Sequence, residues 1–255
     1  MTRRRPLIAG NWKMHQTVAS AGALVADILS AIPPDAYADV DVVVCPPFTA
    51  LAGVALAIES SGLQLGAQDM SAHEWGAYTG QISAPMLLEF GTRYVILGHS
   101  ECRAYLGVTD ESVNLKVRRA LQHGLIPIVA VGETAEEHRA GQALRKCAAQ
   151  VRAAFDGLAA SDVERCVVAY EPIWAIGSGT SDTPEDAANV IAAIRTAVPG
   201  LERARCLYGG SMKPENAEPL LAQPEIDGGL IGGASLIAHG FAQIVDYARK
   251  ATATR

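Results

Sequence analysis

The sequence predicts an α/β protein, a (β/α)8 barrel that occupies residues 1–255 as a single domain. Short apolar segments alternate with longer amphipathic segments, eight such pairs can be counted, and no linker-like or low-complexity stretch divides them. Barrels of this kind commonly reach 255 residues as one domain. A doubly wound open sheet is the competing architecture, but no Gly-x-Gly-x-x-Gly motif follows the first expected strand.

The expected strands are short segments that are mostly β-branched or leucine-rich. They are apolar throughout, without alternation, which is typical of strands buried on both faces of a parallel sheet. In chain order the expected strands are Leu7–Asn11, Val40–Cys45, Leu63–Ala67, Tyr94–Leu97, Ile126–Val131, Cys166–Tyr170, Cys206–Tyr208 and Gly229–Ile231.

Helical patterns occupy the intervals between these strands. Val18–Ala31 has apolar residues at helical spacing, and Ser112–His123 ends at Gly124, a favourable C-cap. Thr134–Leu158 is a long helical pattern that is polar on one side. Thr183-Pro184-Glu185 supplies an N-cap, a first-turn proline and a first-turn acid, which predicts a helix from Pro184 onward.

Composition and charge exclude several classes of protein. The net charge of -6 argues against a large basic surface for nucleic acid, so an anion has to be bound by local donors. No apolar run approaches the length of a membrane span, and the one after the N-terminal arginines is too short for a signal peptide. The five cysteines show no disulfide or metal-ligand spacing. We therefore expect reduced thiols in a cytoplasmic protein with no nucleic-acid or membrane partner.

Three reactive side chains follow expected strands, at the carboxyl face where such barrels carry their chemistry. Lys13 follows the first strand, His99 the fourth and Glu171 the sixth. Taken singly, each has an ordinary explanation: a surface lysine, a structural histidine and a helix N-cap. Together they place a cation, an imidazole and a carboxylate on one rim, which favours a catalytic site.

Glycine-rich segments follow the remaining strands. Gly209-Gly210-Ser211 comes after the seventh strand and Gly232-Gly233 after the eighth. Tight turns would explain them, but loops at these two positions often bind phosphate through backbone amides. The segment Pro172–Thr180 is apolar in its middle and glycine-rich at its end, which suits a lid that excludes water better than a buried connector.

Several sequence blocks together resemble the triosephosphate isomerase family along the whole chain. They are Asn11-Trp12-Lys13-Met14, Gly76-Ala77-Tyr78-Thr79-Gly80, Gly98-His99-Ser100-Glu101, Ala169-Tyr170-Glu171-Pro172-Ile173-Trp174-Ala175-Ile176-Gly177, Tyr208-Gly209-Gly210-Ser211 and Gly232-Gly233-Ala234-Ser235-Leu236. The resemblance implies a TIM barrel that interconverts dihydroxyacetone phosphate and D-glyceraldehyde 3-phosphate through an enediolate, a step of glycolysis and gluconeogenesis. It implies no metal or organic cofactor.

The resemblance also implies a role for each matching residue. Glu171 would be the base that moves the proton. His99, kept neutral by a helix N-terminus, and Lys13 would stabilise the enediolate oxygens. Asn11 would orient the oxyanion side, and Glu101 would support Lys13. Asn11 and Lys13 would also bind substrate, together with backbone amides that hold the phosphate, namely those of Gly177, Ser211, Gly232 and Gly233.

A homodimer is implied as well, in which the loop Gly76–Gln81 reaches into the partner subunit. Where many family members have an acid, an arginine and a second acid at this contact, the chain has Gln81, Cys102 and Val108. Because all three charges are missing together, no charge is left unpaired, and we expect the contact to persist with little salt dependence. Two alternatives stay open for the function: a related isomerase for tetrulose phosphates, and a barrel that binds phosphate without catalysis.

Overall fold

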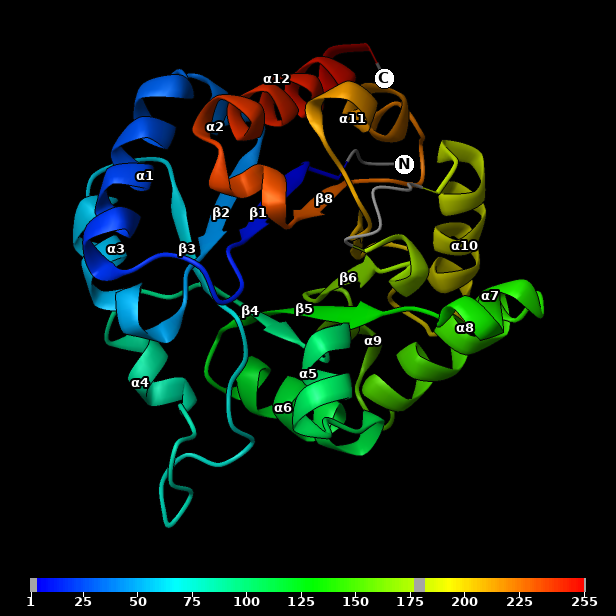
Figure 1. Ribbon diagram of the computed structural model, residues 1–255. Coiled ribbons are helices and arrows are strands. Elements are labelled where there is room, and N and C mark those ends of the chain that lie inside the picture. The colour runs from blue at the N-terminus through cyan, green and yellow to red at the C-terminus, as the bar shows by residue number, and fades with distance from the viewer. Residues whose placement is uncertain (1–3, 177–181, 255) are drawn as a thin grey trace.

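The computed structural model describes residues 4–176 and 182–254. Eight parallel strands pair in chain order, and the last pairs with the first to close a barrel. The helices lie around this barrel (Figure 1). The predicted (β/α)8 architecture is therefore confirmed.

Each observed strand begins and ends within one residue of its expected range. The reason is that these segments are apolar on both faces, so their burial leaves little ambiguity about where they lie. The strands are β1 (Leu7–Asn11), β2 (Asp41–Cys45), β3 (Gln64–Ala67), β4 (Tyr94–Leu97), β5 (Ile126–Val131), β6 (Val167–Tyr170), β7 (Arg205–Tyr208) and β8 (Gly228–Ile231).

The helices are mostly short, and the described residues also include three single turns of 3-10 helix. The α-helices are α1 (Val18–Ala31), α2 (Ala36–Asp39), α3 (Leu51–Ala57), α4 (Ala84–Leu88), α5 (Ser100–Leu106), α6 (Asp110–Gln122), α7 (Ala135–Arg139), α8 (Ala143–Ala154), α9 (Ala160–Val163), α10 (Pro184–Ala197), α11 (Pro214–Leu221) and α12 (Ala238–Thr254). The 3-10 turns are η1 (Phe48–Ala50), η2 (Ile173–Ala175) and η3 (Gly233–Leu236). None of the helices in the described residues is long and apolar enough to span a lipid bilayer.

Capping residues set several helix ends as the sequence predicts. Thr183 caps α10 by accepting a hydrogen bond from the backbone N–H of Asp186, and Gly124 adopts the left-handed φ of 76° after α6. The single pattern expected over Thr134–Leu158 is wrong, because two helices, α7 and α8, occupy it. Gly141, with a φ of 66°, turns the backbone between them.

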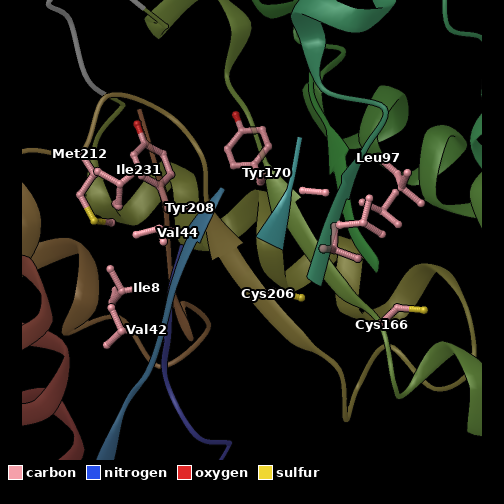
Figure 2. Close-up of a cluster of buried hydrophobic side chains, with 14 of the residues drawn as sticks. Ile8, Val42, Val44, Leu97, Cys166, Tyr170, Cys206, Tyr208, Met212 and Ile231 are labelled. Carbon is pink, nitrogen blue, oxygen red and sulfur yellow. The ribbon is translucent and has the colours of Figure 1, made fainter. Parts of the chain in front are cut away.

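Apolar side chains form two layers of core, one on each side of the sheet. Inside the barrel, Leu7, Ala9 and Leu207 pack together with other inward-facing residues. Outside it, Ile8 and Val42 face the helices, in the layer that Figure 2 shows in part. This alternation along each strand explains why the strands lack a polar face, and it makes the barrel a rigid frame for the loops at its rim.

The loop between β3 and α4 stands out from the barrel (Figure 1). Glu74 of this loop forms an ion pair with Arg119 of α6 at 2.9 Å, and its Oε1 lies 2.7 Å from Nε2 of His123, the residue that follows α6. The rings of His73 and Tyr78 in the same loop stack with centroids 3.9 Å apart. The loop is thus an ordered projection with an aromatic side.

Candidate active site

Residues from the carboxyl ends of several strands line a cavity of about 830 Å³. Asn11 ends β1 and Lys13 follows it, His99 follows β4, and Glu171 follows β6. Ser211 after β7 and the pair Gly232 and Gly233 after β8 line the same cavity, as does Glu101. The structure therefore brings together all the site residues named from the sequence except Gly177, which lies outside the described residues.

Lys13 is held in a backbone conformation that side-chain-bearing residues rarely adopt. Its φ is 51°, a strain of the order of 1–3 kcal/mol that surrounding contacts have to sustain. The backbone N–H of Lys13 donates to Asn11 Oδ1 at 3.0 Å, and Gln68 Nε2 donates to the carbonyls of Lys13 (2.7 Å) and Cys45 (3.0 Å). These hydrogen bonds fix the direction in which the lysine leaves the strand.

The side chain of Lys13 pairs with Glu101 at the edge of the cavity. Lys13 Nζ lies 2.6 Å from Glu101 Oε1, and Glu101 Oε2 lies 3.7 Å from His99 Nδ1. Both members of the Lys13–Glu101 pair are partly exposed, so the pair contributes little to stability. Glu101 thus lies between the lysine ammonium and the imidazole.

His99 occupies the N-cap position of α5, and this position determines where its proton lies. The backbone N–H of Glu101 donates to His99 Nδ1 at 3.2 Å. Because a backbone N–H can only donate, Nδ1 accepts and carries no proton. The imidazole is thus neutral, and its one N–H is at Nε2, on the side of Glu171. Such a group can donate a hydrogen bond to a ligand oxygen in the cavity.

Glu171 is a buried carboxylate with one satisfied oxygen and one free oxygen. Oε2 accepts a hydrogen bond from the backbone N–H of Ser100 at 3.1 Å. Oε1 lies 3.2 Å from His99 Nε2, but this contact lacks hydrogen-bond geometry, so Oε1 has no hydrogen-bond partner among the described residues. A buried acceptor left unsatisfied is costly, and such groups occur where a ligand or substrate is to bind.

Two glycines in the rim loops have distinct steric roles. A Cβ at Gly209 would lie 2.8 Å from Glu171 Cγ, so the side chain of Glu171 occupies space that only glycine leaves free. Gly233 begins η3, and a Cβ there would meet nothing within 4 Å. No side chain therefore crowds the backbone at Gly233, which suits the close approach of an anion.

Comparison with known proteins gives one consistent result. The model of the family described as Triosephosphate isomerase matches residues 6–248. The chain belongs to the triosephosphate isomerase family. Similar curated proteins of that name include those of Chloroflexus aurantiacus (50% identical; 96% of this chain and 99% of the relative covered) and Rubrobacter xylanophilus (50%; 96% and 98%). A third, from Thermoanaerobacter sp. (strain X514), is 50% identical, with 96% and 100% covered.

Some residues that shape the site of this triosephosphate isomerase family member escaped the sequence analysis. Gln68 links Lys13 to β2, but a lone glutamine after a strand carries no recognisable signal. Glu133 is fully buried and accepts a hydrogen bond at 2.7 Å from Nε1 of Trp174, which follows Glu171 by three residues in the chain. An acid at the end of an apolar strand was the signal that could have found Glu133, since Glu171 was found in that way.

Proposed function

We propose that this member of the triosephosphate isomerase family interconverts dihydroxyacetone phosphate and D-glyceraldehyde 3-phosphate through an enediolate. The observation that carries the proposal is the placement of Glu171 Oε1, His99 Nε2 and the Lys13 ammonium around one cavity. The family membership of nearly the whole chain supports the same conclusion.

The reaction moves a carbonyl by one carbon, and a single carboxylate can do this. Glu171 takes the proton from the carbon beside the carbonyl and returns it to the neighbouring carbon. The free oxygen, Oε1, has no competing hydrogen bond in the described residues, so it is available as the base. The Ser100 N–H on the other oxygen holds the carboxylate in place before substrate binds.

The enediolate carries negative charge on oxygen, which His99 and Lys13 stabilise. The neutral imidazole donates its Nε2 proton, and the lysine supplies a fixed positive charge in a partly buried cavity. Donors fixed in advance are effective because they need no reorganisation as charge develops. Asn11 holds the backbone of Lys13 and also lines the cavity.

The phosphate is assigned to the loops after β7 and β8. Ser211, Gly232 and Gly233 line the same cavity as the reactive groups, and a Cβ at Gly233 would meet nothing within 4 Å. Gly177 completes the set proposed from the sequence, although it lies outside the described residues. Binding the phosphate away from the reacting carbons orients the substrate toward Glu171.

A coupled assay with purified protein tests this function against both alternatives. We expect turnover of D-glyceraldehyde 3-phosphate with a kcat/KM far above that for a tetrulose phosphate. A higher kcat/KM for the tetrulose phosphate would assign the related isomerase activity. Tight binding of phosphate compounds without turnover of either substrate would leave a non-catalytic barrel.

We also propose that the protein is a homodimer held through the loop Gly76–Gln81. This region carries large apolar side chains in solvent, including Trp75 (67% exposed) and Tyr78 (41%). Tyr105 on α5 is 82% exposed, and Met14 after β1 is 95% exposed. Such side chains on a single chain are usual where a second copy covers them.

Two of the neutral residues at this proposed contact, Gln81 and Cys102, have defined surroundings within their own subunit. Gln81 Oε1 accepts a hydrogen bond from Ser71 Oγ at 2.5 Å, so it braces its own loop. Burial raises the pKa of the Cys102 thiol to about 11, which keeps it neutral. A cytoplasmic location belongs to this proposal too, because all five cysteines are unpaired and free thiols persist best in a reducing compartment.

A further inference from the structure

Two buried carboxylates face one tyrosine hydroxyl beneath the loops of the site. Glu133 is fully buried and Asp182 is 7% exposed. The hydroxyl of Tyr170, the last residue of β6, lies 3.2 Å from Glu133 Oε1 and 3.5 Å from Asp182 Oδ2. Figure 2 shows Tyr170 near Tyr208 of β7, with both hydroxyls pointing toward the same side. None of these four groups has a role in the proposed proton transfer.

Among the described residues, the Tyr170 hydroxyl offers its single proton to two carboxylate oxygens. Glu133 Oε1 accepts from Trp174 Nε1 at 2.7 Å and, at the shorter of the two tyrosine contacts, from Tyr170, and it lies 3.4 Å from His138 Nδ1. Tyr170 has only one proton to donate, and giving it to Glu133 leaves its oxygen as an acceptor. Asp182 Oδ1 accepts from the backbone N–H of Thr183 at 2.9 Å, whereas Oδ2 faces the Tyr170 oxygen. A proton on Asp182 Oδ2 completes the arrangement.

We propose that Asp182 is a positioning residue that holds a proton and donates it to Tyr170, which in turn donates to Glu133. The chain of two hydrogen bonds, from Asp182 to Tyr170 to Glu133, has one proton for each acceptor. Loss of the Asp182 proton sets two negative carboxylates against one hydroxyl in a buried place, where like charges repel strongly.

The groups around Asp182 favour the proton. Burial is the largest influence and raises the pKa of Asp182, and the negative charges of Asp186 on α10 and Glu133 after β5 act in the same direction. The Thr183 N–H and His138 on α7 oppose them by favouring the anion.

The hydroxyls that face the pair are weak acids. Burial raises the pKa of Tyr208 to about 12, and burial, followed by the nearby acids, raises that of Tyr170 still further. Cys147 on α8, 4.0 Å from Glu133, is a neutral thiol for the same reason. The proton that titrates is therefore assigned to Asp182 and not to these hydroxyls or this thiol.

The shared proton ties together both described ends of the segment that runs from Glu171 to Thr183. At one end, Trp174 is bound to Glu133, and the N–H of Ile173 donates to the Glu133 carbonyl at 3.1 Å. At the other end, the N–H of Asp182 donates to the Tyr208 hydroxyl at 3.3 Å. Tyr170 immediately precedes Glu171 in the chain, so a disturbed Tyr170 hydroxyl would move the proposed base.

Carboxyl 13C NMR on the ligand-free protein tests the proton directly. Comparison with Asp182→Asn assigns the resonance, and Glu185→Gln, which removes an exposed acid three residues away, is the matched control. We expect Asp182 to titrate above an ordinary aspartate and the control to leave that titration unchanged. Titration at or below the ordinary value would overturn the proposal.

The effect on catalysis rests on the proposed function and is measured separately. The pH profile of kcat/KM should decline above the Asp182 titration in the parent protein, and Asp182→Asn should remove that decline, because the amide donates without ionising. A profile in Asp182→Asn that matches the parent would refute the positioning role. If the parent protein has no isomerase activity but Asp182 titrates high, the proposed function fails and the shared proton stands.

Discussion

His99 Nε2 lies 3.2 Å from Glu171 Oε1, and neither atom has completed a hydrogen bond with the other. One atom carries the imidazole proton, and the other is a carboxylate oxygen without a donor. A donor and a base that adjoin without satisfying each other are prepared for a third group. The substrate proposed above is such a group, because it has a carbonyl oxygen for the imidazole N–H and an acidic C–H for the carboxylate.

Replacing the proposed base should abolish most of the turnover. Glu171→Gln keeps the shape and the Ser100 contact but removes the basicity, and a positioned general base contributes roughly 100-fold to 10,000-fold. We expect at least that loss in kcat, with binding of the substrate analogue 2-phosphoglycolate largely retained. Near-normal turnover in the variant would show that another group is the base.

The contact between Gly209 and Glu171 predicts a second loss of activity. In Gly209→Ala the new methyl group meets Glu171 Cγ at 2.8 Å, so the carboxylate has to shift. A displacement of about 1 Å can reduce turnover by about 100-fold, and we expect kcat to fall more than KM rises. Gly22→Ala on α1, where a Cβ meets nothing within 4 Å, is the control and should keep full activity. Equal activity of both variants would contradict this steric role.

The raised pKa of Asp182 makes stability depend on pH with a defined sign. The folded protein retains the Asp182 proton to a higher pH than the unfolded chain, whose ordinary value is 3.8. Between these two values the folded state binds more protons, so the free energy of unfolding decreases as pH rises. Asp182→Asn should therefore gain Tm relative to the parent from about pH 4 upward. If the difference in Tm between Asp182→Asn and the parent is the same at pH 3 and at pH 8, the pKa of Asp182 is not raised.

The neutral subunit contact predicts a dimer that resists salt. Gln81, Cys102 and Val108 provide no charge for an ion pair, so salt screening has little to weaken there. Sedimentation at micromolar concentration should show the same dimer across a wide range of salt. Cys102 should react slowly with thiol reagents, because its raised pKa leaves little thiolate. A monomer, or dissociation that salt strongly promotes, would count against this assembly.

The lid predicted from the sequence spans Pro172–Thr180, and a ligand is expected to order Trp174–Thr180, of which the structure describes only the part up to Ile176. Hydrogen exchange in this stretch should slow when 2-phosphoglycolate saturates the protein. The expected reason is that phosphate binding recruits backbone amides of the glycine-rich part. Exchange that is unchanged at saturation would refute the lid, and exchange in α3, remote from the cavity residues, serves as the reference.

Structure was predictable from the sequence where one physical requirement, such as burial on both faces, determined a short segment. Strands buried on both faces require continuous apolar residues, and the fold then places Lys13, His99 and Glu171 at one rim. Helix ends were predicted where a cap was obvious, as at Thr183. The break at Gly141 was missed because amphipathic patterning continues through it, although the glycine itself was a visible signal.

Contacts between distant residues were beyond the sequence. Glu133 and Asp182 each resemble a surface acid when read alone, and only the closed barrel brings them to the hydroxyl of Tyr170. The tautomer of His99 was equally inaccessible, since it depends on which backbone N–H points at Nδ1. Such features arise from three-dimensional register, which no local pattern encodes.

Gln68 connects the chemistry to the state of assembly. Its amide holds the carbonyl of Lys13, and it lies at the start of the projecting loop whose aromatic side is assigned to a second subunit. If the loop lost its contact with the second subunit, the side-chain amide of Gln68 would be held less firmly, and so would the strained backbone of Lys13. Specific activity would then fall on dilution, so that the concentration of the protein itself sets how much of it is catalytically competent.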